Sequence, residues 1–189
     1  MANIGFIGLG HMGLPMAINL IKAGHQVHGY DLQASAQNAF LQAGGQIAPS
    51  IKAIAQNNAI LITMLQTGQQ VKNVCFGEEG LYQQARPQTL HIDCSTIDVP
   101  TAIELQQYAH SLGLEAVDAP VSGGVSGASA ATLTFMLGGT SDACAKAHSI
   151  LQSMGKQIIL TGAGGSGQAA KICNNMILGI SMVAVSEAF

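Results

Sequence analysis

Lys171 is the residue of this chain best placed to act as an acid or a base. It is the only Asp, Glu, Lys, Arg or His between Lys156 and Glu187, and it stands near the start of an otherwise apolar stretch with helical character. A lysine desolvated in such a place has a pKa lowered toward neutrality and can serve as a general acid/base. Asn175 follows four residues later on the same helical face, where its amide can hold a hydroxyl group. A solvated lysine on the exposed side of the helix is the alternative.

A glycine-rich turn near the N-terminus has the spacing that binds a dinucleotide. Residues 8–13 read G-L-G-H-M-G, directly after a predicted strand and at the start of a predicted helix. The first glycine allows the tight turn, the second lets the backbone approach a pyrophosphate, and the third lets the helix pack on the strand. Because the strand–turn–helix context is what confirms this motif, we predict phosphate binding at the helix N-terminus. The predicted contact residues are Gly8, Leu9, Gly10, His11, Met12 and Gly13.

The end of the second predicted strand indicates which dinucleotide binds. Asp31 lies about 20 residues beyond the glycines, where a carboxylate can accept hydrogen bonds from the ribose hydroxyls of NAD. It would repel the 2′-phosphate of NADP, and the next residue is Leu32 rather than an arginine. We therefore predict NAD as the cofactor, contacted by Tyr30 and Asp31. An Asp31 that only caps the following helix is the alternative.

Three segments lie at the carboxyl ends of predicted strands, where open α/β sheets bind ligands. They are residues 65–67, 93–96 and 118–124. In the third, Ser122, Gly123 and Gly124 could present a hydroxyl and two unobstructed N–H groups to a carboxylate, as an anion nest does. An ordinary flexible turn is the alternative for that segment.

The elements that must position these residues alternate along the chain. Strands are predicted at residues 3–7, 27–30, 59–64, 89–94, 115–118, 133–137 and 157–160. Helices are predicted at residues 11–23, 33–43, 51–55, 69–75 and 142–154, with a further helix that begins at Asp98 as N-cap and runs to Leu112. This order predicts an α/β fold of Rossmann type, with a doubly wound, mostly parallel sheet.

Composition narrows the class of protein. The chain has 189 residues and is 48% hydrophobic, which suits one α/β domain, or one domain plus part of another. Only 9% of the residues are charged, the net charge is −3, and the seven basic residues form no stripe. We therefore expect no nucleic-acid partner.

Cysteines and histidines give no sign of a metal site. The six histidines are dispersed, and the closest pair, His25 and His28, is expected at the surface. The four cysteines show no C-x-x-C pair, and we expect reduced thiols in the core, in a reducing compartment. They are Cys75, Cys94, Cys144 and Cys173.

We expect a cytoplasmic protein with no membrane partner. No signal or transit peptide precedes the first strand, and the longest apolar run, residues 176–185, is shorter than the ~20 residues that span a bilayer. Residues 167–189 are compatible with one helix that has a wide apolar face and no stop signal. Since such a face needs a partner, we expect a missing second domain, or self-association of this chain.

Four segments of the chain resemble the β-hydroxyacid dehydrogenases. The first, GFIGLGHMG, is shared across that family, and the last, GQAAKICNNM, is more specific. The resemblance implies a second, all-helical domain after the long helix, and a homo-oligomer in the full-length protein. We therefore divide the chain into an NAD-binding domain, 1–163, and the beginning of the interdomain helix, 164–189. The four segments are residues 5–13, 93–98, 118–124 and 167–176.

This resemblance implies roles for the residues that could bind and convert a substrate. Lys171 matches the family's catalytic lysine, and Asn175 matches its hydrogen-bonding partner. Ser122, Gly123 and Gly124 match the segment that binds the substrate carboxylate.

It also implies cofactor contacts outside the glycine turn. Thr96 matches a residue near the nicotinamide end. Met64, Leu65, Gln66 and Gln70 correspond to a cofactor-contacting loop, in which Gln66 stands where the family often has proline.

The implied activity is oxidation of a small 3-hydroxy acid. The run through residues 173–175 is most similar to the branch that oxidises 3-hydroxyisobutyrate to methylmalonate semialdehyde in valine catabolism, with NAD as oxidant. One alternative is a reductase of tartronate, glyoxylate or succinate semialdehyde; many such enzymes use NADP, against which Asp31 weighs. The other is a non-catalytic NAD-binding module on the same fold.

Overall fold

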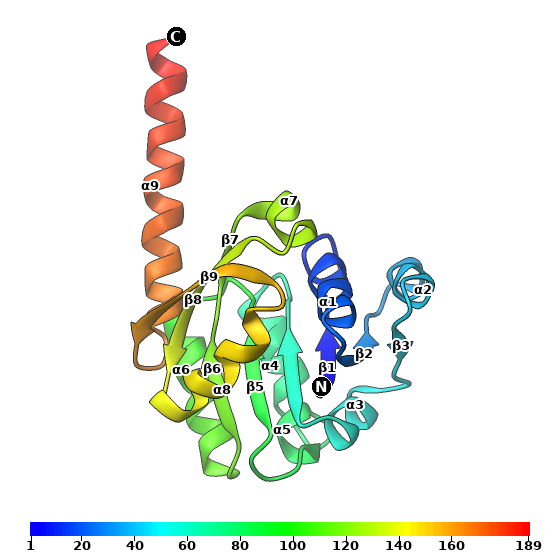
Figure 1. Cartoon of the computed structure of the whole chain (residues 1–189). Helices are drawn as coiled ribbons and strands as arrows, with labels where there is room; N and C mark the ends of the chain where they lie inside the picture. Colours follow the sequence, from blue (N-terminus) through cyan, green and yellow to red (C-terminus); the bar gives the residue numbers. More distant parts are fainter.

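The computed structural model describes all residues, 1–189, and has a mostly parallel sheet between two layers of helices (Figure 1). The order across the sheet is β3-β2-β1-β4-β5-β6-β8-β7, and β9 pairs with β8. The strands are β1 (Asn3–Ile7), β2 (Gln26–Tyr30), β3 (Gln46–Ile47), β4 (Ile60–Thr63), β5 (Leu90–Asp93), β6 (Glu115–Asp118), β7 (Val121–Ser122), β8 (Leu133–Gly139) and β9 (Gly155–Gly162). The prediction of a doubly wound α/β fold is confirmed.

The direction in which successive strands are added to the sheet reverses between β1 and β4, although both strands run parallel. From β1 the chain builds outward through β2 and β3, and it then returns to place β4, β5 and β6 on the other side of β1. In open α/β sheets a ligand binds at the carboxyl ends of the strands beside such a switch point. The glycine turn follows β1, so the fold places it at this point.

The helices form two layers with separate apolar cores. On one face, α1 and α8 bury residues such as Met16 and Ala147 against Phe6 and Ile92 of the sheet. On the other, α3 to α6 pack around Tyr82 and the opposite side of the strands. The helices are α1 (Gly13–Lys22), α2 (Ala34–Gln42), α3 (Ile51–Asn57), α4 (Gly68–Cys75), α5 (Leu81–Gln84), α6 (Val99–Ser111), α7 (Gly124–Ser129), α8 (Ser141–Leu151) and α9 (Ser166–Ala188).

Every predicted strand and helix is present, and four short elements were not predicted. These elements are β3, β7, α5 and α7, none longer than 6 residues. Elements of this length carry too few residues for a periodic pattern, and their pairing partners lie elsewhere in the chain. The predicted N-cap at Asp98 is confirmed, because its carboxylate accepts a hydrogen bond from the Thr101 N–H at the start of α6.

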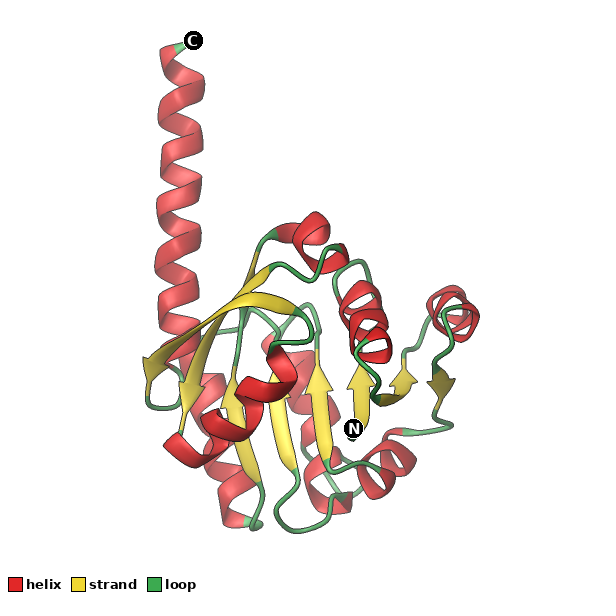
Figure 2. Cartoon of the chain, viewed as in Figure 1, coloured by secondary structure: helices red, strands yellow, loops and turns green.

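The C-terminal helix α9 stands away from the rest of the molecule (Figure 2). Only its first turns contact the sheet and α6, and from Ile172 onward every residue is exposed. By length and composition alone α9 could cross a membrane, although core helices of soluble proteins meet the same test. The apolar helix therefore extends beyond the run 176–185, which on its own is too short to span a bilayer.

One expectation about a single residue was wrong. Cys173 lies exposed on α9, whereas Cys75, Cys94 and Cys144 are buried thiols as expected. His91 is buried, with 2% of its surface exposed, because β5 lies at the centre of the sheet. A strand that is covered on both faces buries its polar side chains as well as its apolar ones.

Candidate nucleotide and substrate site

The three glycines of the turn after β1 meet different surroundings. Gly8 has φ +95°, and a Cβ on it would lie 2.2 Å from the carbonyl oxygen of Met64. A Cβ on Gly13 would lie 1.8 Å from the carbonyl oxygen of Gly8, so the start of α1 and the end of β1 pack too closely for a side chain. At Gly10 no atom lies within 4 Å of such a Cβ. Gly8 and Gly13 are therefore required by the fold, and Gly10 leaves its backbone open to a ligand.

Asp31 ties the glycine turn to the end of β2. Its Oδ2 accepts the backbone N–H of Leu9 at 2.7 Å, and its Oδ1 accepts that of Gln33 at 2.8 Å. The N-cap of α2 is Gln33 and makes no side-chain capping bond, so Asp31 is not simply the cap of that helix. The carboxylate faces the cavity described next, with lone pairs left to accept further hydrogen bonds.

A cavity of about 560 Å³ lies beside the glycine turn, over the ends of β1, β2 and β4. Its walls include many of the predicted cofactor residues. These are Gly8, Gly10, Tyr30, Asp31, Met64, Leu65, Gln66 and Gln70. Leu9, His11, Met12, Gly13 and Thr96, also predicted, do not line it.

Several lining residues of this cavity were missed from the sequence. Asn73 and Val74 follow Gln70 at helical spacing on α4, so the spacing could have indicated them. Ile51 comes from α3 and Ala36 from α2, and no local signal marks either of them. Apolar side chains of this kind suit the flat face of a nucleotide base. The others are Ile7, Leu32 and Gln33.

The loop after β4 is held in place by hydrogen bonds at both of its ends. Leu65 N–H donates to Ser95 Oγ at 2.9 Å, and Gln66 N–H donates to the side-chain oxygen of Gln70 at 3.0 Å. Thr67 caps α4 by accepting the amide of Gln70. These hydrogen bonds restrict the conformation of the loop, as the fixed φ angle of a proline would.

The segment Ser122 to Gly124 joins β7 to α7. Gly123 and Gly124 both have positive φ, +133° and +63°, conformations that glycine adopts readily. The segment is followed by a short helix, and the Asn19 side chain on α1 donates to the Ala128 carbonyl of that helix at 2.6 Å. Carboxylate binding here stays a prediction.

Lys171 lies in the second turn of α9. It is half-buried, and its desolvation lowers the pKa of the ammonium group. Gln168, Lys171 and Asn175 are three and four residues apart, so they share one face of the helix. Asn175 is exposed.

Gln168 connects that face to the loop that carries Thr96. Its side-chain oxygen accepts the Ile97 N–H at 3.1 Å, and its amide group donates to the Ser95 carbonyl at 2.7 Å. Thr96 is exposed between these two anchored neighbours. The predicted nicotinamide loop therefore lies against the first turn of α9, directly below Lys171 on the helix face.

A buried polar chain runs beneath the loops after β4 and β5. Tyr82 Oη lies 2.7 Å from His91 Nδ1, and Thr63 Oγ1 lies 2.9 Å from His91 Nε2 and donates to Asp93 Oδ1 at 2.8 Å. A neutral His91 satisfies all three bonds by accepting from Tyr82 and donating to Thr63. Burial lowers the pKa of His91 to about 3 and raises that of Asp93 to about 6.

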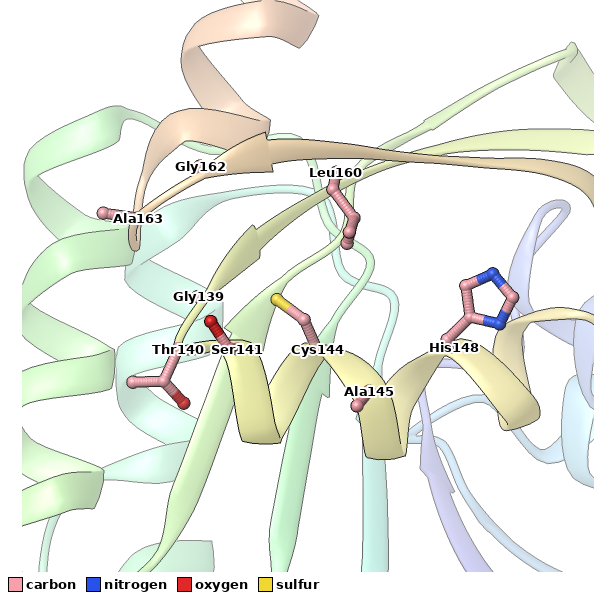
Figure 3. A pocket seen from close by; sticks show the side chains of 9 residues that line it. All are labelled: Gly139, Thr140, Ser141, Cys144, Ala145, His148, Leu160, Gly162 and Ala163. Atoms are coloured by element: carbon pink, nitrogen blue, oxygen red, sulfur yellow. The ribbon is translucent and has the colours of Figure 1, made fainter.

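A second cavity, of about 730 Å³, lies between α8 and β9 (Figure 3). Cys144 of α8 and Leu160 of β9 point toward each other across it, and His148 lies farther along the helix (Figure 3). None of the predicted site residues lines this cavity. No group of three or more His, Cys, Asp or Glu side chains is arranged to hold a metal ion.

Comparison with known proteins gives the chain its family. Residues 3–162 match the family described as the NAD binding domain of 6-phosphogluconate dehydrogenase. The chain is 46% identical over 188 residues to 3-hydroxyisobutyrate dehydrogenase of Pseudomonas aeruginosa, covering 100% of this chain and 63% of that protein. It is 43% identical over 188 residues to NAD-dependent L-serine dehydrogenase of the same organism, with 100% and 63% covered.

The fold agrees with a solved structure of the same kind. The structure of Mycobacterium tuberculosis 3-hydroxyisobutyrate dehydrogenase with L-serine superposes with a TM-score of 0.95 at 44% identity, covering 100% of this chain and 64% of that one. The chain thus spans less than two thirds of the length of these relatives. By its glycine turn, its sheet order and these similarities, the chain belongs to the family of the NAD-binding domain of 6-phosphogluconate dehydrogenase.

Proposed function

We propose that this chain is the nucleotide-binding part of an NAD-dependent dehydrogenase that oxidises 3-hydroxyisobutyrate to methylmalonate semialdehyde. The observation that carries the proposal is the placement of Gln168, Lys171 and Asn175 on one helix face whose base contacts the Thr96 loop. Relatives named 3-hydroxyisobutyrate dehydrogenase at 46% and 45% identity support the choice of substrate. A place in valine catabolism follows from that substrate.

The residues present fit an NAD molecule. Gly10 leaves its backbone uncovered, α1 begins two residues after His11, and Asp31 lies in the wall of the cavity where a ribose would be held. Bound NAD supplies the acceptor for the hydride that leaves the substrate carbon. We propose NAD rather than NADP because the carboxylate of Asp31 would repel a 2′-phosphate.

The chain's own residues then supply position and proton transfer. Ser122, Gly123 and Gly124 hold the substrate carboxylate with a hydroxyl and backbone N–H groups. Lys171, as a neutral amine, takes the hydroxyl proton while the carbon loses its hydride and the C–O single bond becomes a carbonyl. Desolvation favours that neutral form, and Asn175 orients the hydroxyl.

We further propose that α9 continues into a second, helical domain that covers its apolar face. Its exposed side chains include Met176, Ile177, Ile180 and Val183, a surface that is costly to leave in water. In the M. tuberculosis structure, the part that corresponds to this chain makes up 64% of a longer chain. The division at residues 163 and 164, a homo-oligomer and a cytoplasmic location belong to the same proposal.

L-Serine is the second candidate substrate. One relative is named an NAD-dependent L-serine dehydrogenase at 43% identity, and the M. tuberculosis structure is described with L-serine. Serine is also a 3-hydroxy acid, so the same carboxylate contacts and the same lysine would serve it.

The test is an assay of NAD reduction by the full-length protein with 3-hydroxyisobutyrate, L-serine, glycerate and 4-hydroxybutyrate. We expect the highest kcat/KM with 3-hydroxyisobutyrate and with NAD over NADP. A preference for L-serine would move the protein to the neighbouring branch and leave the proposed roles of Lys171 and Asp31 intact. NAD binding without turnover of any hydroxy acid would contradict the proposal and favour a non-catalytic module.

A further inference from the structure

Helix α9 begins without a capping side chain of its own. Its N-cap position is Gly165, in the left-handed conformation at φ +84°, and glycine has no side chain to accept the free N–H groups of the first turn. Such groups need a partner when they are buried, and Gly165 is buried. The partner comes from β6, far away in the sequence.

Asp118, with 1% of its surface exposed, supplies the missing cap. Its Oδ1 accepts the Gly165 N–H at 2.8 Å, and its Oδ2 accepts the Gln168 N–H at 2.8 Å. Gln106 of α6 donates a third bond to Oδ1, also at 2.8 Å. A buried carboxylate at a helix N-terminus is stabilised by these N–H groups and by the helix dipole.

The contact is too close to allow any side chain at Gly167. A Cβ there would lie 2.7 Å from Asp118 Oδ2 and 2.3 Å from the Met136 carbonyl oxygen. The start of α9 is therefore fixed in position against β6 and β8, and the angle at which the helix leaves the sheet is fixed with it.

Gln168 fixes the rotation of the helix about its axis. Its side chain is 0% exposed, and it joins α9 to the Ser95 carbonyl and the Ile97 N–H. Lys171 lies three residues further on the same face. Any rotation of α9 that moved Lys171 sideways would break both bonds of Gln168.

We propose that Asp118 and Gln168 are positioning residues that together aim Lys171 at the substrate held between the Thr96 loop and the Ser122–Gly124 segment. The proposal rests on the proposed function, since it assigns Lys171 its role in proton transfer. Neither residue touches the reacting atoms in this account. Asp118 sets the origin and direction of the helix, and Gln168 sets its rotation.

The test uses the full-length protein and the variant Gln168→Met, which keeps the length of the side chain and loses both hydrogen bonds. Gln107→Met, on the exposed side of α6, is the matched control. We expect kcat to fall about 100-fold in Gln168→Met, the order of loss caused by a misplacement of about 1 Å. The Kd for NAD should stay within about twofold of wild type, a change of less than 0.5 kcal/mol.

A second readout separates positioning from a merely structural role. The pH at which kcat rises to half its plateau should shift upward in Gln168→Met, because Lys171 gains access to water and its amine is harder to deprotonate. Asp118→Asn should act in the same direction, with Asp142→Asn as its control, since Asp142 is exposed on α8. Loss of NAD binding together with turnover, or a lower kcat with an unchanged pH profile, would overturn the proposal.

The positioning role can also be tested if the proposed substrates are wrong. Acetylation of Lys171, followed by mass spectrometry across a pH series, reports the protonation of that amine without turnover. We expect Lys171 to react at lower pH in wild type than in Gln168→Met. Equal pH profiles of acetylation would overturn the positioning role even in a protein that oxidises none of the hydroxy acids tested.

Discussion

The backbone N–H of Leu9 donates a hydrogen bond of 2.7 Å to the carboxylate of Asp31, across the gap between the glycine turn and the end of β2. The other carboxylate oxygen accepts the N–H of Gln33. Asp31 therefore has two functions in this account, since it shapes the turn that meets the pyrophosphate and lies where the ribose hydroxyls would bind.

The first prediction concerns the substitution Asp31→Asn. The amide has one acceptor oxygen in place of two, so its NH₂ group must face either the Leu9 or the Gln33 N–H. We expect NAD affinity to fall about 10- to 100-fold, the range for a hydrogen bond to a charged group, and the ratio of NAD to NADP affinity to fall with it. Calorimetric titration with both dinucleotides measures this, with Asp142→Asn as control. Unchanged selectivity would show that Asp31 does not discriminate between them.

The second prediction separates the roles of two glycines in the same turn. Gly13→Ala should destabilise the fold by about 1–3 kcal/mol or more, because its Cβ would lie 1.8 Å from the Gly8 carbonyl oxygen. Gly10→Ala meets no atom within 4 Å, so the free energy of unfolding should change little. NAD binding by Gly10→Ala should nevertheless weaken at least about 10-fold, or 1.4 kcal/mol.

Denaturant unfolding and NAD titration of both variants test this pair. A Gly10→Ala protein that binds NAD normally would mean that the pyrophosphate does not approach this backbone. A Gly13→Ala protein as stable as wild type would contradict the close packing of α1 on the end of β1.

The third prediction follows from the buried histidine. His91 has a folded-state pKa of about 3, below its ordinary value of 6.5, so the stability due to its neutral form is complete above pH 6.5. That stability is lost as the pH falls from 6.5 toward 3, by an amount on the order of several kcal/mol. Asp93 acts in the opposite direction, because its pKa is raised to about 6 and its charged form is the costly one.

Urea unfolding between pH 4 and 8 measures the effect of His91→Gln. The stability difference between wild type and this variant should shrink as the pH falls below 6.5. His110→Gln gives the effect of removing an exposed histidine at the end of α6. A difference that stays constant over this pH range would contradict a neutral, buried His91.

The parts of the fold predicted from the sequence are those with local signals. The glycine turn, the Asp98 cap and the apolar strands each depend on neighbouring residues, and each appears where the pattern indicates. The cap of α9 depends on Asp118, which is 47 residues before Gly165, and no local pattern connects the two. The same holds for Asn19, which holds α7 from 109 residues away.

Within the candidate site, the residues that could be predicted are those whose motif partners lie close to them in the sequence. The cavity beside Asp31 contains several of the predicted cofactor residues together with Ile51 and Ala36, which belong to separate helices. Those apolar walls come from chain segments that meet only after folding. The partners of the buried His91, Tyr82 and Thr63, likewise come from other segments of the chain.

The central claim is that Lys171 takes the proton of the alcohol. The most direct measurement is the rate of NAD reduction by the full-length protein in a single turnover at saturating substrate, compared for wild type, Lys171→Ala and Lys171→Arg. We predict a loss of about 100-fold or more in both variants, the size expected for general acid/base catalysis, because Arg keeps the positive charge and cannot accept a proton. NAD affinity should be unchanged in both. Near-normal turnover in Lys171→Ala would contradict the account.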